Sequence, residues 1–535
     1  MKHLYSFLLS ALVCLSLSAQ NKVSGDSLAA DFHYLVKQLE AAHPDPYTGF
    51  GGKVFFHKQA FDLENELRSQ PHTLQEFWDK SMAFLSFIQD GHTYLFSLAS
   101  KQQQQSYLPV GFRCIPDGLI VQSLPAAHQD LLGSLLVGIN GKSMDELLAR
   151  TASLFACENL YNRYSVFCRN VVRRQFMQQL LPDLEDTVCF YLRTPDGKDV
   201  TLEQHFMENE ELRKAEKVNL PSWVGCPEEQ MAYRFIDKKK EVMMFKVNSI
   251  MARDNFEYMY KHMKGDLLRQ MEFYYQSALK KEMPADTLQA IRALPSFSGT
   301  FAAMLKEMKK HHSEYLIIDL RGNSGGWTPI VLASLYQLYG DKYLQKDMDT
   351  EYYRIVSPLY MNKLEITLEE FNRRYGTDYS FGDYTFSMKE QEDIPLDTLR
   401  RQFIDGCMSS VKEELRAQKG APVYAPKQVF VVTDERTFSA AFHYAFMLWK
   451  MGATVVGVPS GQAPNTFMEQ TLFKLPYTGI EGSISNSVQI FLPGKDKRAK
   501  TFWPDVMLTY DEYKQTGFDK QAEILFLLNK IGQEK

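Results

Sequence analysis

The segment that most constrains how this chain can fold is Gln428–Pro459. It begins with a β-branched and aromatic run, Val429–Val432, which is typical of a buried strand. A polar turn follows, an amphipathic helix begins at Ser439, and the apolar run Ala453–Val458 predicts the next strand. This order places the Ser439 hydroxyl at the N-terminal end of a helix, where unpaired backbone N–H groups and the helix dipole favour negative charge.

The position of Ser439 allows two interpretations. A serine so placed can attack a carbonyl carbon while the following N–H groups, starting with that of Ala440, stabilise the oxyanion. Serine is also among the preferred N-cap residues of ordinary helices. On this segment alone the N-cap interpretation is favoured.

A second segment, Tyr315–Trp327, changes this balance. It reads YLIIDLRGNSGGW, which is an apolar strand with Asp319 and Arg321 at its carboxyl end and a glycine-rich turn after it. Glycines let a backbone approach a ligand closely and turn its N–H groups outward. We expect Asp319 and Arg321 to form a structural ion pair that holds this turn, rather than to take part in catalysis.

The motifs IIDLRGNSGG and TFSAA…GATVVGVPSG together resemble the core of the C-terminal-processing (tail-specific) serine protease family. That family includes tricorn-like and interphotoreceptor retinoid-binding-protein-like branches. The resemblance implies an α/β fold with a crotonase-like (ClpP/crotonase) catalytic core. It also implies Ser439 as nucleophile, an oxyanion hole made by the N–H of Ala440 and one glycine N–H of Gly325–Gly326, and no cofactor or metal.

A serine hydroxyl needs a neighbouring base, and the family supplies one in two ways. One branch uses a lysine about 25 positions after the serine, but the matching segment here, Val458–Asn465, contains no lysine. The other branch uses a histidine from a D-G-H-T element, which is present here as Asp90–Thr93. His43–Tyr47 matches the H-P-x-x-Y element that is typical of the same branch. The resemblance therefore implies His92 as the base, and a neutral imidazole suits catalysis near pH 7.

Three residues are candidates for the acid that would orient this histidine. In the histidine branch a glutamate lies shortly before a closing P-D strand, which Pro504-Asp505 resembles. The corresponding segment here, Lys495–Thr501, contains Asp496 as its one acid, and Glu469 and Glu481 are alternatives in nearby segments.

The N-terminus has the pattern of a secretory signal. Lys2 precedes an apolar run, and small residues up to Ala19 follow it. The apolar run is too short to span a bilayer, and no later segment reaches the length of a membrane helix, so we expect no stable membrane insertion. Lipid attachment through Cys14 is the less favoured alternative. We expect the protein to be exported, to a bacterial periplasm or beyond.

Length and composition predict a chain of several domains. At 535 residues it is too long for one core. We expect a signal peptide at 1–19, a helical domain at 20–100, a PDZ-like region at 101–225 and the catalytic core at 226–535. The PDZ-like assignment rests on strands around GSLLVGIN, and a small β-domain without a peptide groove is the alternative. A net charge of −5 gives no sign of nucleic-acid binding, and no C-x-x-C pair predicts a thiol or zinc site.

These observations favour an exported serine endopeptidase that hydrolyses peptides or unfolded protein tails. Two alternatives remain. The chain could be a catalytically silent member that binds a peptide or small hydrophobic ligand, or a hydrolase acting on a non-peptide ester or amide. The oligomeric state stays open.

Overall fold

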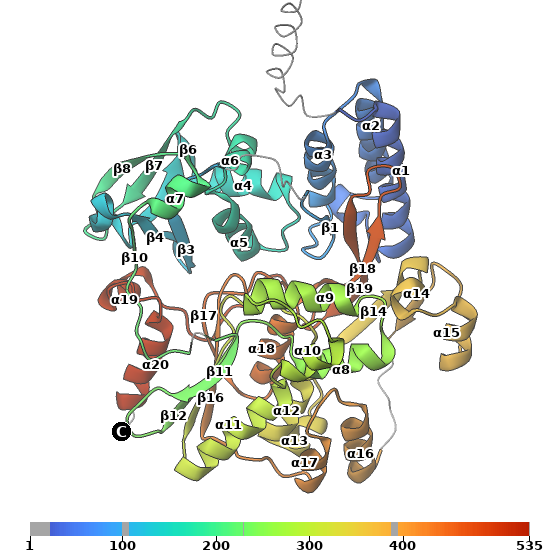
Figure 1. Ribbon diagram of the computed structural model, residues 1–535, viewed down its shortest axis with the longest axis vertical. Helices are drawn as coiled ribbons and strands as arrows, with labels where there is room; N and C mark the ends of the chain where they lie inside the picture. Colours follow the sequence, from blue (N-terminus) through green and yellow to red (C-terminus); the bar gives the residue numbers. More distant parts are fainter. Residues whose placement is uncertain (1–21, 99–105, 228, 387–393, 534–535) are drawn as a thin grey trace, which may run out of the picture.

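The computed structural model describes residues 22–98, 106–227, 229–386 and 394–533 (Figure 1). The predicted signal peptide and Cys14 lie outside the described residues. Within those ranges no helix has both the length and the apolar character needed to cross a membrane.

A largely parallel sheet organises the C-terminal half of the chain. Its strand order is β11-β12-β13-β16-β17, in which only β11 runs antiparallel to its neighbour. The strands are β11 (Met231–Phe235), β12 (Val242–Val247), β13 (Tyr315–Asp319), β16 (Gln428–Thr433) and β17 (Thr454–Gly457). The predicted strand–helix–strand unit is confirmed, because β16 leads through α18 (Ala440–Lys450) to β17.

Both faces of this sheet are covered, which is why its strands are almost continuously apolar. Leu316 and Ile318 of β13 face one core with α11 (Phe297–His311), α12 (Pro329–Tyr339) and α18. Tyr315 and Ile317 face a second core with α19 (Tyr510–Gln515) and α20 (Ala522–Gln533). Parallel pairing sets Asp319 opposite Val432, so β13 and β16 end at the same edge of the sheet.

Insertions and connections surround this core. One helical insertion follows β12 and has its own apolar cluster; it comprises α8 (Arg253–His262), α9 (Leu267–Tyr274), η3 (Tyr275–Leu279) and α10 (Thr287–Ala293). Another connection precedes β16; it comprises α13 (Asp341–Leu344), β14 (Glu351–Ile355), α14 (Pro358–Leu364), α15 (Leu368–Tyr375), β15 (Tyr384–Phe386), α16 (Leu396–Gly406) and α17 (Lys412–Ala417).

The segment that follows the N-terminal helices in the chain and precedes the main sheet forms a separate antiparallel sheet with its own apolar core. Its strands are β3 (Gly111–Ile115), β4 (Gly118–Pro125), β5 (Leu135–Ile139), β6 (Lys142–Ser143), β7 (Thr187–Arg193), β8 (Asp199–His205) and β10 (Lys217–Asn219). The short strands β2 (Ser106–Tyr107) and β9 (Met207–Glu208) pair beside it. The helices of this part are η2 (Ala126–Leu131), α4 (Met144–Leu154), α5 (Leu160–Asn170), α6 (Arg174–Leu180) and α7 (Asn209–Lys214).

The N-terminal part is helical, as predicted. It comprises α1 (Gly25–Ala42), η1 (Thr48–Phe50), α2 (Lys53–Ser69), α3 (Leu74–Ser86) and the short strand β1 (Tyr94–Leu95). The hairpin β18 (Asn465–Lys474) and β19 (Glu481–Ile490) extends from the main core to these helices (Figure 1). Its tip shares their apolar cluster, with Phe473 and Ile484 packed among the residues of α1 to α3. The hairpin therefore fixes the N-terminal helices against the C-terminal half.

Candidate active site

Ser439 lies in a strained turn between β16 and α18. Its φ of 50° and ψ of −127° are rare for a residue that carries a Cβ. Such a conformation costs about 1–3 kcal/mol and persists only where the surroundings enforce it. Here the Ser439 N–H donates to Oε1 of Gln462, and Ala440 behind it is fully buried. The turn presents the Ser439 side chain at the head of α18, in the geometry of a nucleophile elbow.

The glycine-rich turn after β13 packs directly against this serine. A Cβ placed on Gly325 would lie 2.6 Å from Ser439 Cβ and 2.9 Å from the Ala440 nitrogen. Gly326 is equally confined, since its Cβ would lie 2.2 Å from the Ile250 carbonyl oxygen. Both glycines have positive φ, 106° and 144°, so only glycine meets the conformational and steric demands together.

The proposed oxyanion donors differ in their availability. The Gly325 N–H donates to Oδ1 of Asn323 at 2.9 Å, so it is already engaged. Nothing in the described part of the chain accepts a hydrogen bond from the N–H of Gly326 or of Ala440. Of the two glycines, Gly326 is therefore the better donor, and it lines the same cleft as Ser439.

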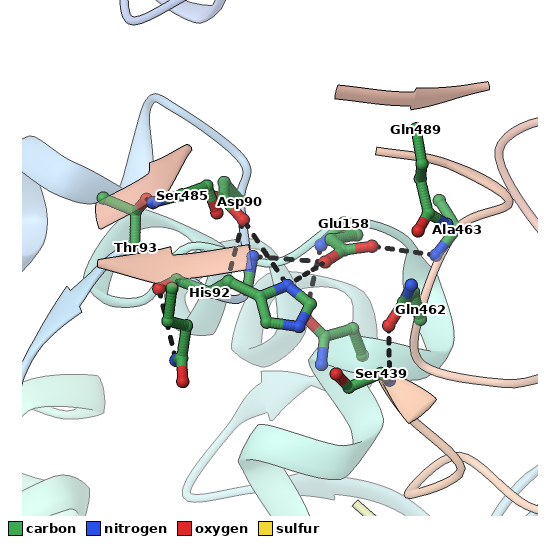
Figure 2. Close-up of polar contacts among 12 residues, drawn as sticks. Asp90, His92, Thr93, Glu158, Ser439, Gln462, Ala463, Ser485 and Gln489 are labelled. Atoms are coloured by element: carbon green, nitrogen blue, oxygen red, sulfur yellow. Dashed lines mark hydrogen bonds and ion pairs between the residues drawn. The ribbon is translucent and has the colours of Figure 1, made fainter. Parts of the chain in front are cut away.

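His92 reaches this cleft from the N-terminal part of the chain. The next strand, β1, pairs with β19, with Tyr94 opposite Ser483. The His92 carbonyl oxygen accepts a hydrogen bond from Ser483 Oγ at 2.5 Å, and Thr93 Oγ1 accepts one from the Ser485 N–H at 3.0 Å. The hairpin that begins just after Gln462 thus holds the D-G-H-T loop beside the Ser439 turn (Figure 2).

The His92 ring has no hydrogen-bond partner for either nitrogen among the described residues, although its side chain is only 7% exposed. Its ring lies against Phe438, the neighbour of Ser439, with a centroid distance of 4.9 Å. Burial lowers the pKa of His92, partly offset by the attraction of Asp90. A buried, neutral and unpartnered imidazole at a cleft wall is suited to accept a proton.

Two carboxyl groups flank Nδ1 of His92. Asp90 Oδ1 lies at 3.8 Å and Glu158 Oε1 at 3.9 Å (Figure 2). Asp90 is fully buried, and although burial alone would raise its pKa, the pairing with His43 at 3.3 Å and further donors lower that pKa to about 2. Asp90 is therefore the charged partner of the His92 ring, and His43 of the H-P-x-x-Y element supports Asp90.

Glu158 comes from the loop before α5 and joins three parts of the chain. Its carboxyl oxygens accept from the N–H of Ala463 at 2.8 Å and of Gly91 at 3.3 Å. Burial, and next the charge of Asp90, raise the pKa of Glu158 to about 8. The imidazole thus lies between one ionised carboxylate and one carboxyl group that is mostly protonated at pH 7.

The three acids that the sequence analysis considered lie elsewhere. Glu469 pairs with Arg354 at 2.6 Å and with Lys363 at 3.4 Å. Burial alone would raise the pKa of Glu469, but these two cations outweigh it and lower the pKa to about 2. Glu481 is exposed at the start of β19, and Asp496 pairs with Arg498 at 2.8 Å. Among the described residues, His92 has only Asp90 and Glu158 as carboxylate neighbours within 4.0 Å. A local signal existed for Asp90, which lies within the D-G-H-T element, whereas Glu158 had none.

His443 is another histidine near the serine, and it has a packing role. It is 2% exposed, and its two ring nitrogens bond to Thr328 Oγ1 at 2.8 Å and to Gln489 Oε1 at 2.7 Å. Burial lowers the pKa of His443 to about 4. With both nitrogens engaged, it is a poor candidate for the base. Asp319 and Arg321 form the structural ion pair that the sequence predicted, at 2.8 Å.

One group of side chains could in principle hold a cation. Asp90, His92 and Glu158 each offer a ligand atom, and these atoms lie within 4.8 Å of one another. Asp90 already pairs with His43 and accepts from the backbone N–H of His92 at 2.9 Å. Because the carboxyl oxygens of Asp90 and Glu158 already accept hydrogen bonds from the protein, this group favours proton transfer over metal binding as its role.

A cleft of about 780 Å³ connects these groups. Ser439, Gly326, His92 and Phe438 line it at one place, and apolar side chains that include Trp78 and Phe155 line it further away. This volume is large enough for a peptide segment of a few residues.

Part of the chain matches a peptidase family, and its fold is similar to that of solved structures. Residues 290–481 match the model of peptidase family S41. No curated protein sequence matches the chain. Mature CPAF is 14% identical, with a TM-score of 0.55 over 95% of this chain and 98% of that one. Its complex with lactacystin gives 14% identity and a TM-score of 0.53 over 94% and 97%. The photosystem II D1 C-terminal processing protease is 11% identical, with a TM-score of 0.39 over 91% and 94%.

Proposed function

Because this chain is a serine-type peptidase with a family S41 domain, we propose that it is an exported endopeptidase with Ser439 as nucleophile and His92 as base. Its substrates are peptides or unfolded protein tails. The observation that carries this proposal is the shared cleft. A strained serine and a buried imidazole without a partner line it together, although one comes from the C-terminal half and the other from the N-terminal part.

The chemistry follows from the placement of these groups. Ser439 Oγ attacks the scissile carbonyl carbon while His92 takes the hydroxyl proton. The negative charge that develops on the carbonyl oxygen is stabilised by the N–H groups of Ala440 and Gly326, which nothing in the described part of the chain occupies. The imidazolium then gives its proton to the leaving amine. Water, activated by the same ring, releases the acyl group from the serine.

The two carboxyl groups take over the role of the orienting acid in this proposal. Asp90 is ionised and stabilises the imidazolium that forms during attack, as the acid of a catalytic triad does. Glu158 adds a second negative charge when it ionises. This ionisation takes place close to neutral pH, because the pKa of Glu158 is about 8. His43 fixes the Asp90 carboxylate through its 3.3 Å contact and acts as a positioning residue.

The fold of each domain and the export of the protein are part of the same proposal. The parallel sheet with Ser439 at its edge is compatible with a crotonase-like core, and the antiparallel sheet of β3 to β10 with a PDZ-like module. The domain boundaries 1–19, 20–100, 101–225 and 226–535 also stay part of this proposal. Three apolar clusters draw most of their residues from 20–100, 101–225 and 226–535, although Phe473 and Ile484 pack with the N-terminal helices. Export rests on the secretory pattern of residues 1–19 alone.

Covalent labelling tests the roles of the two residues. A fluorophosphonate probe should label the chain that begins at Gln20, and Ser439→Ala should abolish labelling and peptide hydrolysis. His92→Ala should slow both by about 10³-fold or more, because the hydroxyl then lacks its base. Ser277→Ala is the matched control, since Ser277 is an exposed serine of η3 outside the cleft.

Two results would contradict the proposal. Labelling that persists in Ser439→Ala would assign the nucleophile to another residue. Peptide binding without labelling of the unmodified chain would favour the silent, ligand-binding alternative.

A further inference from the structure

Three arginines line the proposed catalytic cleft. Arg169 and Arg173 lie at the end of α5 and just after it, and Arg436 lies in the turn that leads to Ser439. All three side chains are exposed to the cleft or to solvent rather than packed in the core. They come from two distant segments of the chain that meet at this wall.

These guanidinium groups lack an ion-pair partner, although several other arginines of this chain have one. Within the described residues, none of the three forms an ion pair within 4.0 Å, whereas Arg113, Arg321 and others do. Arg169 donates from Nε to the Ser165 carbonyl oxygen at 3.1 Å. Arg173 and Arg436 make no side-chain hydrogen bond to a described residue. Each therefore has donors left for a ligand, and a guanidinium has five of them.

The cleft also offers little negative charge to neutralise them. Among the residues that the structure describes, its lining contains two acids, Asp90 and Glu435. Asp90 is fully buried and pairs with His43. Burial, and next the nearby Asp434, raise the pKa of Glu435, which weakens this carboxyl as a counter-charge.

We propose that Arg169, Arg173 and Arg436 form a subsite that binds a carboxylate of the peptide substrate. Guanidinium groups bind carboxylates through paired N–H donors, and a partly enclosed cleft strengthens such contacts. The subsite lies in the same cleft as Ser439, so an anion held there positions the peptide next to the nucleophile. This inference rests on the proposed function for the identity of the ligand as a peptide.

Two sources can supply the carboxylate, namely the free C-terminus and an Asp or Glu side chain. The test measures binding of fluorescent hexapeptides to the Ser439→Ala variant of the whole chain, so that hydrolysis does not interfere. One peptide pair has a free or an amidated C-terminus. The other pair carries Glu or Gln at an internal position. In at least one pair, the carboxylate form should bind about tenfold more tightly, and the pair that discriminates identifies the source.

Charge removal then assigns this preference to the arginines. Arg169→Gln, Arg173→Gln and Arg436→Gln should each reduce the preference for the carboxylate peptide severalfold while binding of the neutral peptide stays unchanged. Arg213→Gln is the matched control, because Arg213 is an exposed arginine of α7 that does not line the cleft. Thermal unfolding of each variant checks that it remains folded.

The outcomes separate this inference from the proposed function. Equal binding of both members of each pair, or a preference that survives all three substitutions, would overturn the subsite even if the fluorophosphonate probe labels Ser439. An arginine-dependent preference would support the subsite even if labelling fails, and the cleft would then belong to a peptide-binding protein.

Discussion

At the scale of single residues, the Glu158 carboxyl group beside His92 changes its protonation state near neutral pH. It is held 3.9 Å from His92 by the N–H groups of Gly91 and Ala463. Because its pKa is raised to about 8, it is protonated below that pH and ionised above it. An ionised Glu158 stabilises the imidazolium of the proposed mechanism, and a protonated one does not.

The first prediction concerns the pH dependence of activity. For the unmodified enzyme, kcat/KM for a fluorogenic peptide should rise as pH increases through about 8, when Glu158 ionises. Glu158→Gln should remove this rise and leave the limb at lower pH that belongs to His92, whose pKa burial lowers. Glu481→Gln, an exposed acid far from the imidazole, serves as control. A rise near pH 8 that persists in Glu158→Gln would contradict the assignment.

Stability should respond to Glu158 in the opposite direction. A carboxyl group whose pKa is raised on folding contributes stability below its unfolded pKa, and this contribution is lost as pH rises through the folded pKa. The window here runs from the ordinary glutamate value of 4.5 to about 8. The Tm of the unmodified protein should therefore fall across this window more steeply than that of Glu158→Gln, as differential scanning fluorimetry would show. Parallel Tm curves would contradict this.

At the scale of elements, the proposed site forms where two strands of the main sheet end. Parallel pairing brings the ends of β13 and β16 together, so the turn with Gly325 and Gly326 meets the turn with Ser439. Ligands of open α/β sheets bind at such carboxyl edges. The hairpin β18–β19 adds His92 to this edge through its pairing with β1.

The second prediction isolates the close packing of this turn. In Gly325→Ala the new methyl group would lie 2.6 Å from Ser439 Cβ, so we expect kcat to fall by about 10²-fold or more as the serine is displaced. Gly322→Ala is the matched control, because Gly322 also has a positive φ, 78°, but has open space around the added methyl group. Steady-state kinetics of both variants separate steric displacement from backbone strain. Equal losses in the two would indicate that strain alone matters.

At the scale of the whole molecule, one buried acid connects three distant parts of the chain. Glu523 of α20 is 1% exposed and pairs with Arg113 of β3 at 2.7 Å and with Arg321 at 2.7 Å. Arg321 in turn pairs with Asp319 at the end of β13. This network attaches the antiparallel sheet and the C-terminal helix to the strand edge that carries the glycine turn.

The third prediction tests this connection. Glu523→Gln keeps the size of the side chain but leaves two buried guanidinium groups short of a counter-charge. Removal of one partner of a buried ion pair costs about 3–5 kcal/mol, so the free energy of unfolding should fall by that order in urea denaturation. Glu272→Gln on the exposed face of α9 is the control. A loss below about 1 kcal/mol would show that the network contributes little.

Much of this architecture could be predicted from local sequence. The apolar runs predicted β13, β16 and β17, because a strand buried on both faces needs consecutive apolar residues. The serine at the head of α18 and the glycine turn followed from short-range patterns as well, since backbone conformation depends mainly on neighbouring residues. The ion pair of Asp319 and Arg321 is equally local, because a single residue separates the two in the chain.

The tertiary structure alone decided what surrounds His92. Its carboxyl neighbour Glu158 comes from the loop before α5, and its position depends on hydrogen bonds from Gly91 of the D-G-H-T loop and from Ala463 just before β18. No local pattern encodes such a meeting, because it results from how separately folded parts pack. Asp496, which the family resemblance suggested, is instead held by Arg498, and the alternative Glu469 is held by Arg354. Sequence determines which groups can react, and packing determines which of them share a buried space.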